Sequence, residues 1–195
     1  FYDVTYHEDG RVKAYTPTHG APPTVKKRAI MDMDKAYYPK DFVVPLIDVV
    51  HNRISEEVLR GCIRGCRFCQ AGFLYRPYRE KSIETIDRQC RDLCLSTGYD
   101  EISLSSLSTS DYVKLNELID TLHQWTEGEK VSLSLPSLRV DNFSPELMER
   151  INSVRKSGLT FAPEAGSQRM RDVINKNVTE EELLHTVNVA FTEGW

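Results

Sequence analysis

The sequence predicts an α/β fold built around a parallel β-sheet. Short strand-like segments alternate with amphipathic helix-like segments about every thirty residues, which is the spacing of strand–helix–strand crossovers. Apolar residues such as Leu115, Leu118 and Leu122 recur at the spacing of one helix face. Helix-start residues and glycine stops flank these segments, so the local signals agree with the pattern of the whole chain.

The first part of the chain, residues 1–52, is expected to be a lead-in arm or linker to a preceding domain. Its prolines disfavour helix, and its apolar residues follow no regular spacing. Within it, the branched residues of 42–50 predict a strand, and Pro45 favours an edge position for that strand. The remaining residues, 53–195, are expected to form the folded core.

The core is expected to contain four strand–helix units. The predicted strands are 54–58, 101–106, 131–135 and 159–162, and helices are expected to begin near residues 82, 111, 144 and 179. Ser144 with Pro145 is typical of a helix start, and Thr179 with Glu182 forms a capping-box pattern. The expected helix stops are Gly98, Gly128, Gly158 and Gly194. Four units are too few to close an eight-stranded barrel, so the sheet is open or its remaining strands lie beyond Trp195.

The composition is that of a soluble globular domain. The chain has 195 residues, 40% of them hydrophobic, and its 25 basic and 29 acidic side chains give a net charge of −4. This balance gives no overall electrostatic case for binding nucleic acid or an anionic membrane. No apolar run approaches the roughly 18 residues of a membrane span, and the first residues do not form a signal peptide. We therefore expect a cytoplasmic protein without a membrane partner. Because it lacks an initiator methionine, we also expect it to be a piece of something longer.

Three of the five cysteines are crowded into one short loop directly after a predicted strand. These loop cysteines, Cys62, Cys66 and Cys69, have the spacing C-x3-C-x2-C, which suits a metal site better than a disulfide framework. Three thiolates can wrap one [4Fe–4S] cluster, which normally takes four cysteines, so one iron would stay open to a small molecule. Gly61 and Gly65 suit a loop that folds tightly around sulfur, because glycine accepts positive φ.

Other interpretations of the cysteines stay open. A zinc site could take its fourth ligand from His51, although the paired knuckles usual in structural zinc sites are missing from the sequence. The three thiols could also be unliganded. Cys90 and Cys94 lie four residues apart on the helix predicted from residue 82, and we interpret them as buried small hydrophobic residues rather than ligands.

The cysteine loop, with Phe68 before its last cysteine and strand–helix units after it, resembles that of the radical S-adenosylmethionine (SAM) superfamily. The resemblance covers residues 54–195. Within this part, three stretches are similar to radical SAM proteins that carry an N-terminal cobalamin-binding-type domain, a group related to the methylthiotransferase-like branch. These stretches are 101–108, 135–141 and 161–168.

The resemblance implies a fold, cofactors and partners. The fold would be a partial TIM-type barrel with about four of six β–α units. The loop cysteines would hold the cluster, whose open iron would bind the amine and carboxylate of SAM. An electron from a donor such as flavodoxin or ferredoxin would cleave SAM to a 5′-deoxyadenosyl radical. The resemblance assigns no substrate and no catalytic residue, RNA stays open as a partner, and cobalamin would enter only through a preceding domain.

Four further residues are expected at the SAM site. The superfamily often has a Gly-Gly-Glu-like stretch after the second strand, and here residues 105–108 occupy that place. Within it, Ser105 and Ser106 are the expected contacts, or Ser106 forms a polar strand end. Arg139 would meet the SAM carboxylate or an anionic substrate group, or else pair with Asp141. Glu164 follows the fourth predicted strand, where a carboxylate would accept the ribose hydroxyls. The carboxyl ends of parallel strands carry the sites of such folds, so these residues are expected near the cysteine loop.

Residues 53–81 carry seven basic side chains against three acidic ones, opposite in sign to the net charge of the chain. These basic side chains would offset the negative charge of the cluster or bind an anionic substrate or RNA. The simpler interpretation is that they form a solvated surface around the metal-binding loop. Tyr75 and Tyr78 are interleaved with the arginines, as in base-stacking surfaces.

The sequence therefore predicts a radical SAM enzyme core. The alternative is a non-catalytic iron–sulfur or zinc module for a protein or RNA partner.

Overall fold

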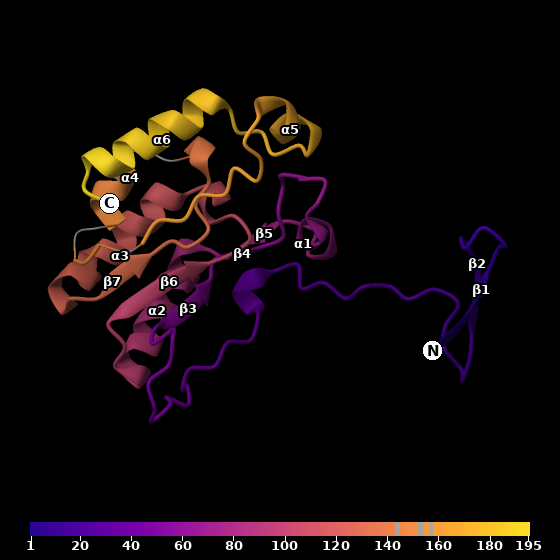
Figure 1. The fold of residues 1–195 in the computed structure, drawn as a ribbon. Coiled ribbons are helices and arrows are strands. Elements are labelled where there is room, and N and C mark those ends of the chain that lie inside the picture. Colours follow the sequence, from indigo (N-terminus) through magenta and orange to yellow (C-terminus); the bar gives the residue numbers. More distant parts are fainter. Residues whose placement is uncertain (143–144, 152–153, 157) are drawn as a thin grey trace. The chain divides into compact units, whose positions relative to one another are not determined.

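A computed structural model describes residues 1–142, 145–151, 154–156 and 158–195. Its contacts divide the chain into two compact units, Phe1–Ile30 and Met31–Trp195. The second unit contains the predicted helices and three of the four strands predicted for the core (Figure 1). Among the described residues, none of the helices combines the length and apolar character that a bilayer span requires.

The first unit is a β-hairpin, where the sequence predicted only an extended arm. Strand β1 (Tyr2–Tyr6) pairs antiparallel with β2 (Val12–Pro17). The turn is closed by the His7 N–H, which donates to the Arg11 carbonyl at 2.8 Å, and Gly10 takes a φ of 81° within it. A proline that disfavours helix is thus compatible with the end of a strand, because β2 ends at Pro17.

The strand expected over residues 42–50 does not form in the described structure. Val43 and Leu46 are almost completely exposed. A strand is held by hydrogen bonds to a neighbouring strand, and Pro45 lacks one of the donors that this pairing needs. The prediction from branched residues alone was therefore wrong here.

The second unit is built on a three-stranded parallel sheet with the order β3–β6–β7 (Figure 1). Its strands are β3 (Ile54–Glu57), β6 (Glu101–Ser105) and β7 (Ser132–Ser134). Side chains alternate between the two faces of a strand, and along β6 Ile102 and Leu104 share one face while Ser103 points to the other. Three of the four predicted strands and their parallel pairing are confirmed.

The fourth predicted strand, 159–162, is not formed, and residues 158–165 have no regular secondary structure. The sheet ends at β7, which offers only three residues for pairing. Pro163 also follows directly and has no N–H to donate. The segment nevertheless contributes side chains to the cavity described below.

Helix α2 (Ile83–Thr97) begins and ends where the sequence predicted. The Ser82 hydroxyl accepts the Thr85 N–H at 3.2 Å, which satisfies one of the free amides of the first turn. The helix ends at Gly98, which has the left-handed φ of 72° expected of a glycine stop. Its buried face packs against β3 and α3.

Helix α3 (Leu115–Glu129) begins later than the predicted position near residue 111, because Thr109–Asp111 form a 3-10 turn, η2. It also continues through Gly128, and Lys130 takes the left-handed conformation, with a φ of 60°. The predicted stop at Gly128 was therefore wrong by two residues. Leucines on the inner face of α3 are fully buried in the core.

The C-terminal part contains α4 (Pro145–Ile151), α5 (Gln168–Val173) and α6 (Glu180–Thr192). The predicted capping box is complete, because the Thr179 hydroxyl accepts the Glu182 N–H and the Glu182 carboxylate accepts the Thr179 N–H. Gly194 has a φ of 85° after α6, whereas Gly158 is not left-handed and lies beyond the end of α4. Ser144, the predicted start of α4, lies outside the described residues.

The remaining elements are short. They are η1 (Met33–Lys35), β4 (Leu59–Arg60), α1 (Gln70–Leu74), β5 (Arg79–Glu80) and η3 (Val140–Asn142). Strands β4 and β5 pair antiparallel and bracket the cysteine loop, which places that loop after the carboxyl end of β3.

Candidate functional site

The cysteine loop starts at a glycine that no other residue could replace without strain. Gly61 has a φ of 93°, and a Cβ on it would lie 2.7 Å from the Pro77 carbonyl oxygen. This close approach holds the start of the loop against its returning end, beside the β4–β5 pair. Gly65 is also left-handed, with a φ of 68°, but has more room around it.

Two of the loop cysteines accept hydrogen bonds from the backbone. The Arg64 N–H donates to Cys62 Sγ at 3.5 Å, and the Gly72 N–H donates to Cys69 Sγ at 3.4 Å. Cys69 is also the N-cap of α1. Amide donors directed at the cysteine sulfurs influence the potential of a bound cluster.

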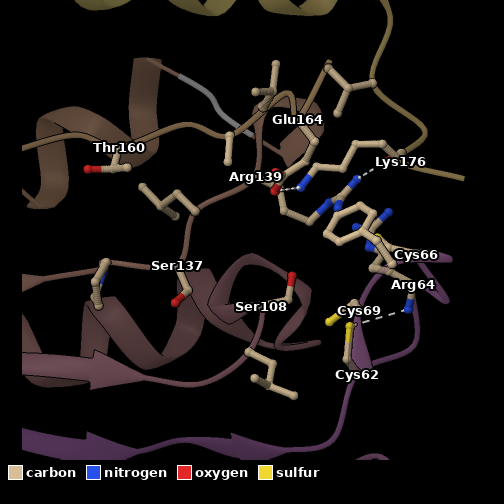
Figure 2. Close-up of a pocket in the computed structure, with 17 residues that line it drawn as sticks. Cys62, Arg64, Cys66, Cys69, Ser108, Ser137, Arg139, Thr160, Glu164 and Lys176 are labelled. Carbon is tan, nitrogen blue, oxygen red and sulfur yellow. Dashed lines mark hydrogen bonds and ion pairs between the residues drawn. The ribbon is translucent and has the colours of Figure 1, made fainter. Parts of the chain in front are cut away.

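The loop cysteines line a cavity of about 280 Å³ together with residues that follow the strands (Figure 2). Other residues that line it include Arg64, Phe68, Leu107, Ser108, Ser137, Arg139, Thr160, Ala162, Glu164, Lys176 and Val178. The cavity therefore lies at the carboxyl ends of β3, β6 and β7, where α/β folds place their ligands.

Arg139 and Glu164, both expected at the SAM site, do line this cavity. Arg139 Nε donates to Asp141 Oδ1 at 2.8 Å, and its Nη2 donates to the Lys176 carbonyl at 2.9 Å. The ion pair between Arg139 and Asp141 is thus present. Glu164 has a left-handed φ of 68°, and its Oε1 accepts from Lys176 Nζ at 3.2 Å.

Ser105 and Ser106 are not among the residues that line the cavity. The Ser106 hydroxyl bonds to the Thr109 hydroxyl at 2.9 Å and accepts the Ser108 N–H at 3.1 Å, so it closes the turn after β6. The Ser105 carbonyl accepts the Val58 N–H at 3.1 Å. Ser108, which belongs to the same stretch but was not among the expected contacts, is the serine that reaches the cavity.

Arg64, between the first two cysteines, reaches the turns after two strands. Its Nε donates to Asp111 Oδ2 at 2.8 Å, and its Nη1 donates to Asp141 Oδ2 at 2.9 Å. Because Asp141 also binds Arg139, these four residues form one arginine–aspartate network. The Asp111 side chain is only 3% exposed. Burial raises the pKa of Asp111, but the hydrogen bonds and charge of Arg64 outweigh it, so the pKa lies below its ordinary value.

The turn after α5 holds the same loop from another direction. The Arg67 N–H donates to the Ile174 carbonyl at 2.9 Å, and Asn175 Nδ2 donates to the Gly65 carbonyl at 3.0 Å. Asn175 itself has a φ of 57°, a conformation that asparagine tolerates better than most residues. Two segments more than one hundred residues apart are thus joined at the cavity.

Arg171 on α5 orders the segment that carries Glu164. Its side chain is 1% exposed, and its guanidinium donates to the carbonyls of Ala165, Gly166 and Val178. The sequence offered no signal for this role, since an arginine on a short helix usually faces solvent. The turn after α5 did have a signal in the sequence, because asparagines such as Asn175 and Asn177 are typical turn residues.

The donor set of the cavity fits an iron–sulfur cluster. Its three thiols come from one short loop, are partly accessible and form no disulfide. Among the described residues, no group of three or more histidine, cysteine, aspartate and glutamate side chains could hold a metal ion as it stands. A four-iron cluster does not need its cysteines to converge on one metal ion, because each cysteine binds a different iron.

Comparisons with known proteins give two curated relatives from Methanocaldococcus jannaschii. The uncharacterized protein MJ0966 is 29% identical over 168 residues, which cover 82% of this chain and 36% of that protein. The putative methylthiotransferase MJ0865 is 25% identical over 141 residues, covering 69% of this chain and 31% of that protein. The chain thus spans about a third of the length of these relatives.

Among solved structures, the cobalamin-dependent S-adenosylmethionine radical enzyme OxsB has a similar fold. The TM-score is 0.60 at 14% sequence identity, and the match covers 95% of this chain and 27% of OxsB. The sequence model of the Radical SAM superfamily matches residues 57–195, which include the loop cysteines and the strands β6 and β7. By this match over most of its length, together with the cysteine loop at the carboxyl ends of a parallel sheet, the chain belongs to the radical SAM superfamily.

Proposed function

We propose that this chain binds a [4Fe–4S] cluster through Cys62, Cys66 and Cys69 and cleaves SAM reductively to begin radical chemistry. The observation that carries the proposal is the single cavity that the three thiols share with Arg139 and Glu164. When bound, the cluster supplies the electron that splits SAM into methionine and a 5′-deoxyadenosyl radical. The chain itself supplies three thiolates, leaving one iron open.

The charged groups opposite the thiols are suited to the polar ends of SAM. In this proposal the Arg139 guanidinium meets the SAM carboxylate, since arginine binds carboxylates in a forked, charge-assisted geometry. Glu164 accepts the ribose hydroxyls, and the Lys176 ammonium, 3.2 Å from Glu164, keeps that carboxylate oriented. Ser108 takes the place near the amine that Ser105 and Ser106 were expected to fill.

We further propose that residues 53–195 are part of a six-unit radical SAM barrel and that residues 1–52 lead in from a preceding domain. In that arrangement cobalamin would be bound by the preceding domain and not by this chain. A cytoplasmic flavodoxin or ferredoxin would provide the electron. The substrate stays unassigned, with RNA as one class to test.

Anaerobic reconstitution with iron and sulfide tests the proposal. We expect about four irons per chain and a change in the EPR spectrum of the reduced cluster when SAM is added. Replacing any loop cysteine by alanine should abolish iron uptake. Cys90→Ala is the matched control, because Cys90 is fully buried in the core and should leave the iron content unchanged.

The same experiment separates the alternative functions. When zinc is offered together with the iron, uptake of one zinc and no iron would replace this proposal by a zinc module. A cluster whose EPR spectrum does not change on addition of SAM would indicate a non-catalytic iron–sulfur module. A SAM response that is lost in Glu164→Gln and Arg139→Gln at unchanged iron content would support the assigned contacts.

A further inference from the structure

Arg64 differs from the other arginines near the cysteine loop in what it contacts. It lies in the spacer between Cys62 and Cys66, yet its guanidinium pairs with Asp111 after β6 and Asp141 in η3. The two aspartates are 47 and 77 residues away in the sequence. The spacer is therefore fixed by side chains from two other strand ends.

The partners of Arg64 are well shielded from solvent. Side-chain exposure is 3% for Asp111 and 13% for Asp141, whereas that of Arg64 is 21%. Ion pairs at exposed sites contribute little, but charge-assisted hydrogen bonds between shielded groups are stronger and geometrically specific. This network is thus able to set the position of the spacer.

The arginine–aspartate network is balanced in charge. Arg64 and Arg139 carry two positive charges, and Asp111 and Asp141 carry two negative ones, all beside the cavity that the loop cysteines line. Removing one member leaves a net charge next to the thiols. In a partly buried setting such a charge is screened only weakly, so it changes the cost of adding an electron nearby.

We propose that Arg64 is a positioning residue of the cluster site, which holds the cysteine spacer in its binding shape before the cluster is present and balances the charge beside it. This inference rests on the proposed function, because it concerns the cluster assigned there. Arg64 acts through the backbone of its own loop: its N–H donates to Cys62 Sγ, and its carbonyl accepts from Asn175 Nδ2 at 3.3 Å.

The test compares Arg64→Met, Asp111→Asn and the double variant with the wild-type protein. Arg64→Met leaves a net negative charge and should lower the reduction potential of the cluster, whereas Asp111→Asn leaves a net positive charge and should raise it. The double variant restores neutrality, so its potential should return toward that of the wild type. Redox titration followed by EPR measures these shifts.

A second measurement follows the shape of the loop rather than its charge. Arg64→Met should lose iron to a chelator about tenfold faster than the wild type, since a charge-assisted contact is lost. In the cluster-free protein, the Arg67 amide should also exchange its hydrogen faster. Arg64→Lys keeps the charge without the forked geometry. Its cluster should therefore have a reduction potential near that of the wild type, while it retains iron better than Arg64→Met but less well than the wild type.

Arg150→Met is the matched control, because it removes an arginine from an ion pair with Asp120 that lies on the helices and not at the cavity. It should behave as wild type in every measurement. The inference alone is overturned if the wild type binds its cluster and Arg64→Met and Asp111→Asn shift the potential in the same direction or not at all. A wild-type protein that takes up no iron overturns this inference and the proposed function together.

Discussion

At the scale of single residues, the five cysteines separate into two groups by their surroundings. The loop cysteines are partly exposed at the cavity, whereas Cys90 and Cys94 are buried on the inner face of α2. Burial raises the pKa of the Cys90 thiol well above its ordinary value, and it raises that of Cys94 to about 11. The interpretation of these two as core residues is confirmed by their burial.

This separation predicts an uneven reaction with thiol reagents. In the cluster-free, folded protein at about pH 8, the three loop cysteines should be alkylated first, because a thiolate must be both formed and reachable. Cys90 and Cys94 should react only after unfolding in urea. Mass spectrometry of the labelled peptides gives the order, and early labelling of Cys90 would contradict the burial described here.

Asp111 predicts a dependence of stability on pH. Its pKa is lower in the folded protein than in the unfolded chain, so its pairing with Arg64 stabilises the fold above the ordinary carboxyl pKa of about 3.9. This contribution is lost as the pH falls through that value toward the folded-state pKa. The difference in unfolding free energy between wild type and Asp111→Asn should therefore be largest near neutral pH and shrink below about pH 4. Urea denaturation over this range measures it, and a constant difference would exclude the ion pair as its source.

At the scale of elements, the cysteine loop depends on the backbone approach at Gly61. The β4–β5 pair and the loop are too close there for any Cβ, which would meet the Pro77 oxygen at 2.7 Å and the Tyr78 Cα at 2.9 Å. The loop also has contacts with the turn after α5, so its shape depends on three segments of the chain. Glycine is required at this position for steric as well as conformational reasons.

Gly61→Ala should therefore displace the loop and abolish stable iron binding. The control is Gly98→Ala, which has the same left-handed strain, with a φ of 72°, but nothing within 4 Å of its Cβ. That control should cost about 1 kcal/mol of stability and leave the iron content unchanged. Iron analysis and thermal unfolding of both variants make the comparison. Equal iron content in the two would show that the close approach does not matter.

At the scale of the whole molecule, the second unit is held by one core between the sheet and its helices. Fully buried residues of this core include Ile54, Ile86, Ile102, Leu118 and Leu133. Each comes from a different element, and three of them from the three parallel strands. The sheet is therefore held in place by helix packing as well as by its own hydrogen bonds.

Leu118→Ala tests this core against an exposed leucine. Leu118 is 0% exposed on α3, and the loss of its side chain should lower the unfolding free energy by about 2–5 kcal/mol. Leu95→Ala on α2 makes the same chemical change where 83% of the residue is exposed, and it should change stability by less than about 1 kcal/mol. Urea denaturation curves measure the unfolding free energy of both variants. Similar losses in the two would contradict the assignment of Leu118 to the core.

Much of the fold could be predicted because its signals are local. The Ser82 cap, the Gly98 stop and the Thr179 capping box depend on residues within one helix turn, and all three are confirmed. Predictions failed where a partner was needed: residues 42–50 have the composition of a strand, but no neighbouring strand pairs with them in the described structure. Hydrogen-bond partners far along the chain leave no local trace.

The site shows the same division. The spacing of Cys62, Cys66 and Cys69 was determined by the sequence, because three thiols within eight residues must share one loop whatever surrounds them. Arg139 and Glu164 were also expected there and do line the cavity. Tertiary structure decided the rest, since Ser108 and not Ser106 faces the cavity and Arg64 pairs with aspartates from two distant turns. The physical reason is that covalent spacing confines neighbours in the chain, whereas contacts between strand ends exist only once the sheet has brought those ends together.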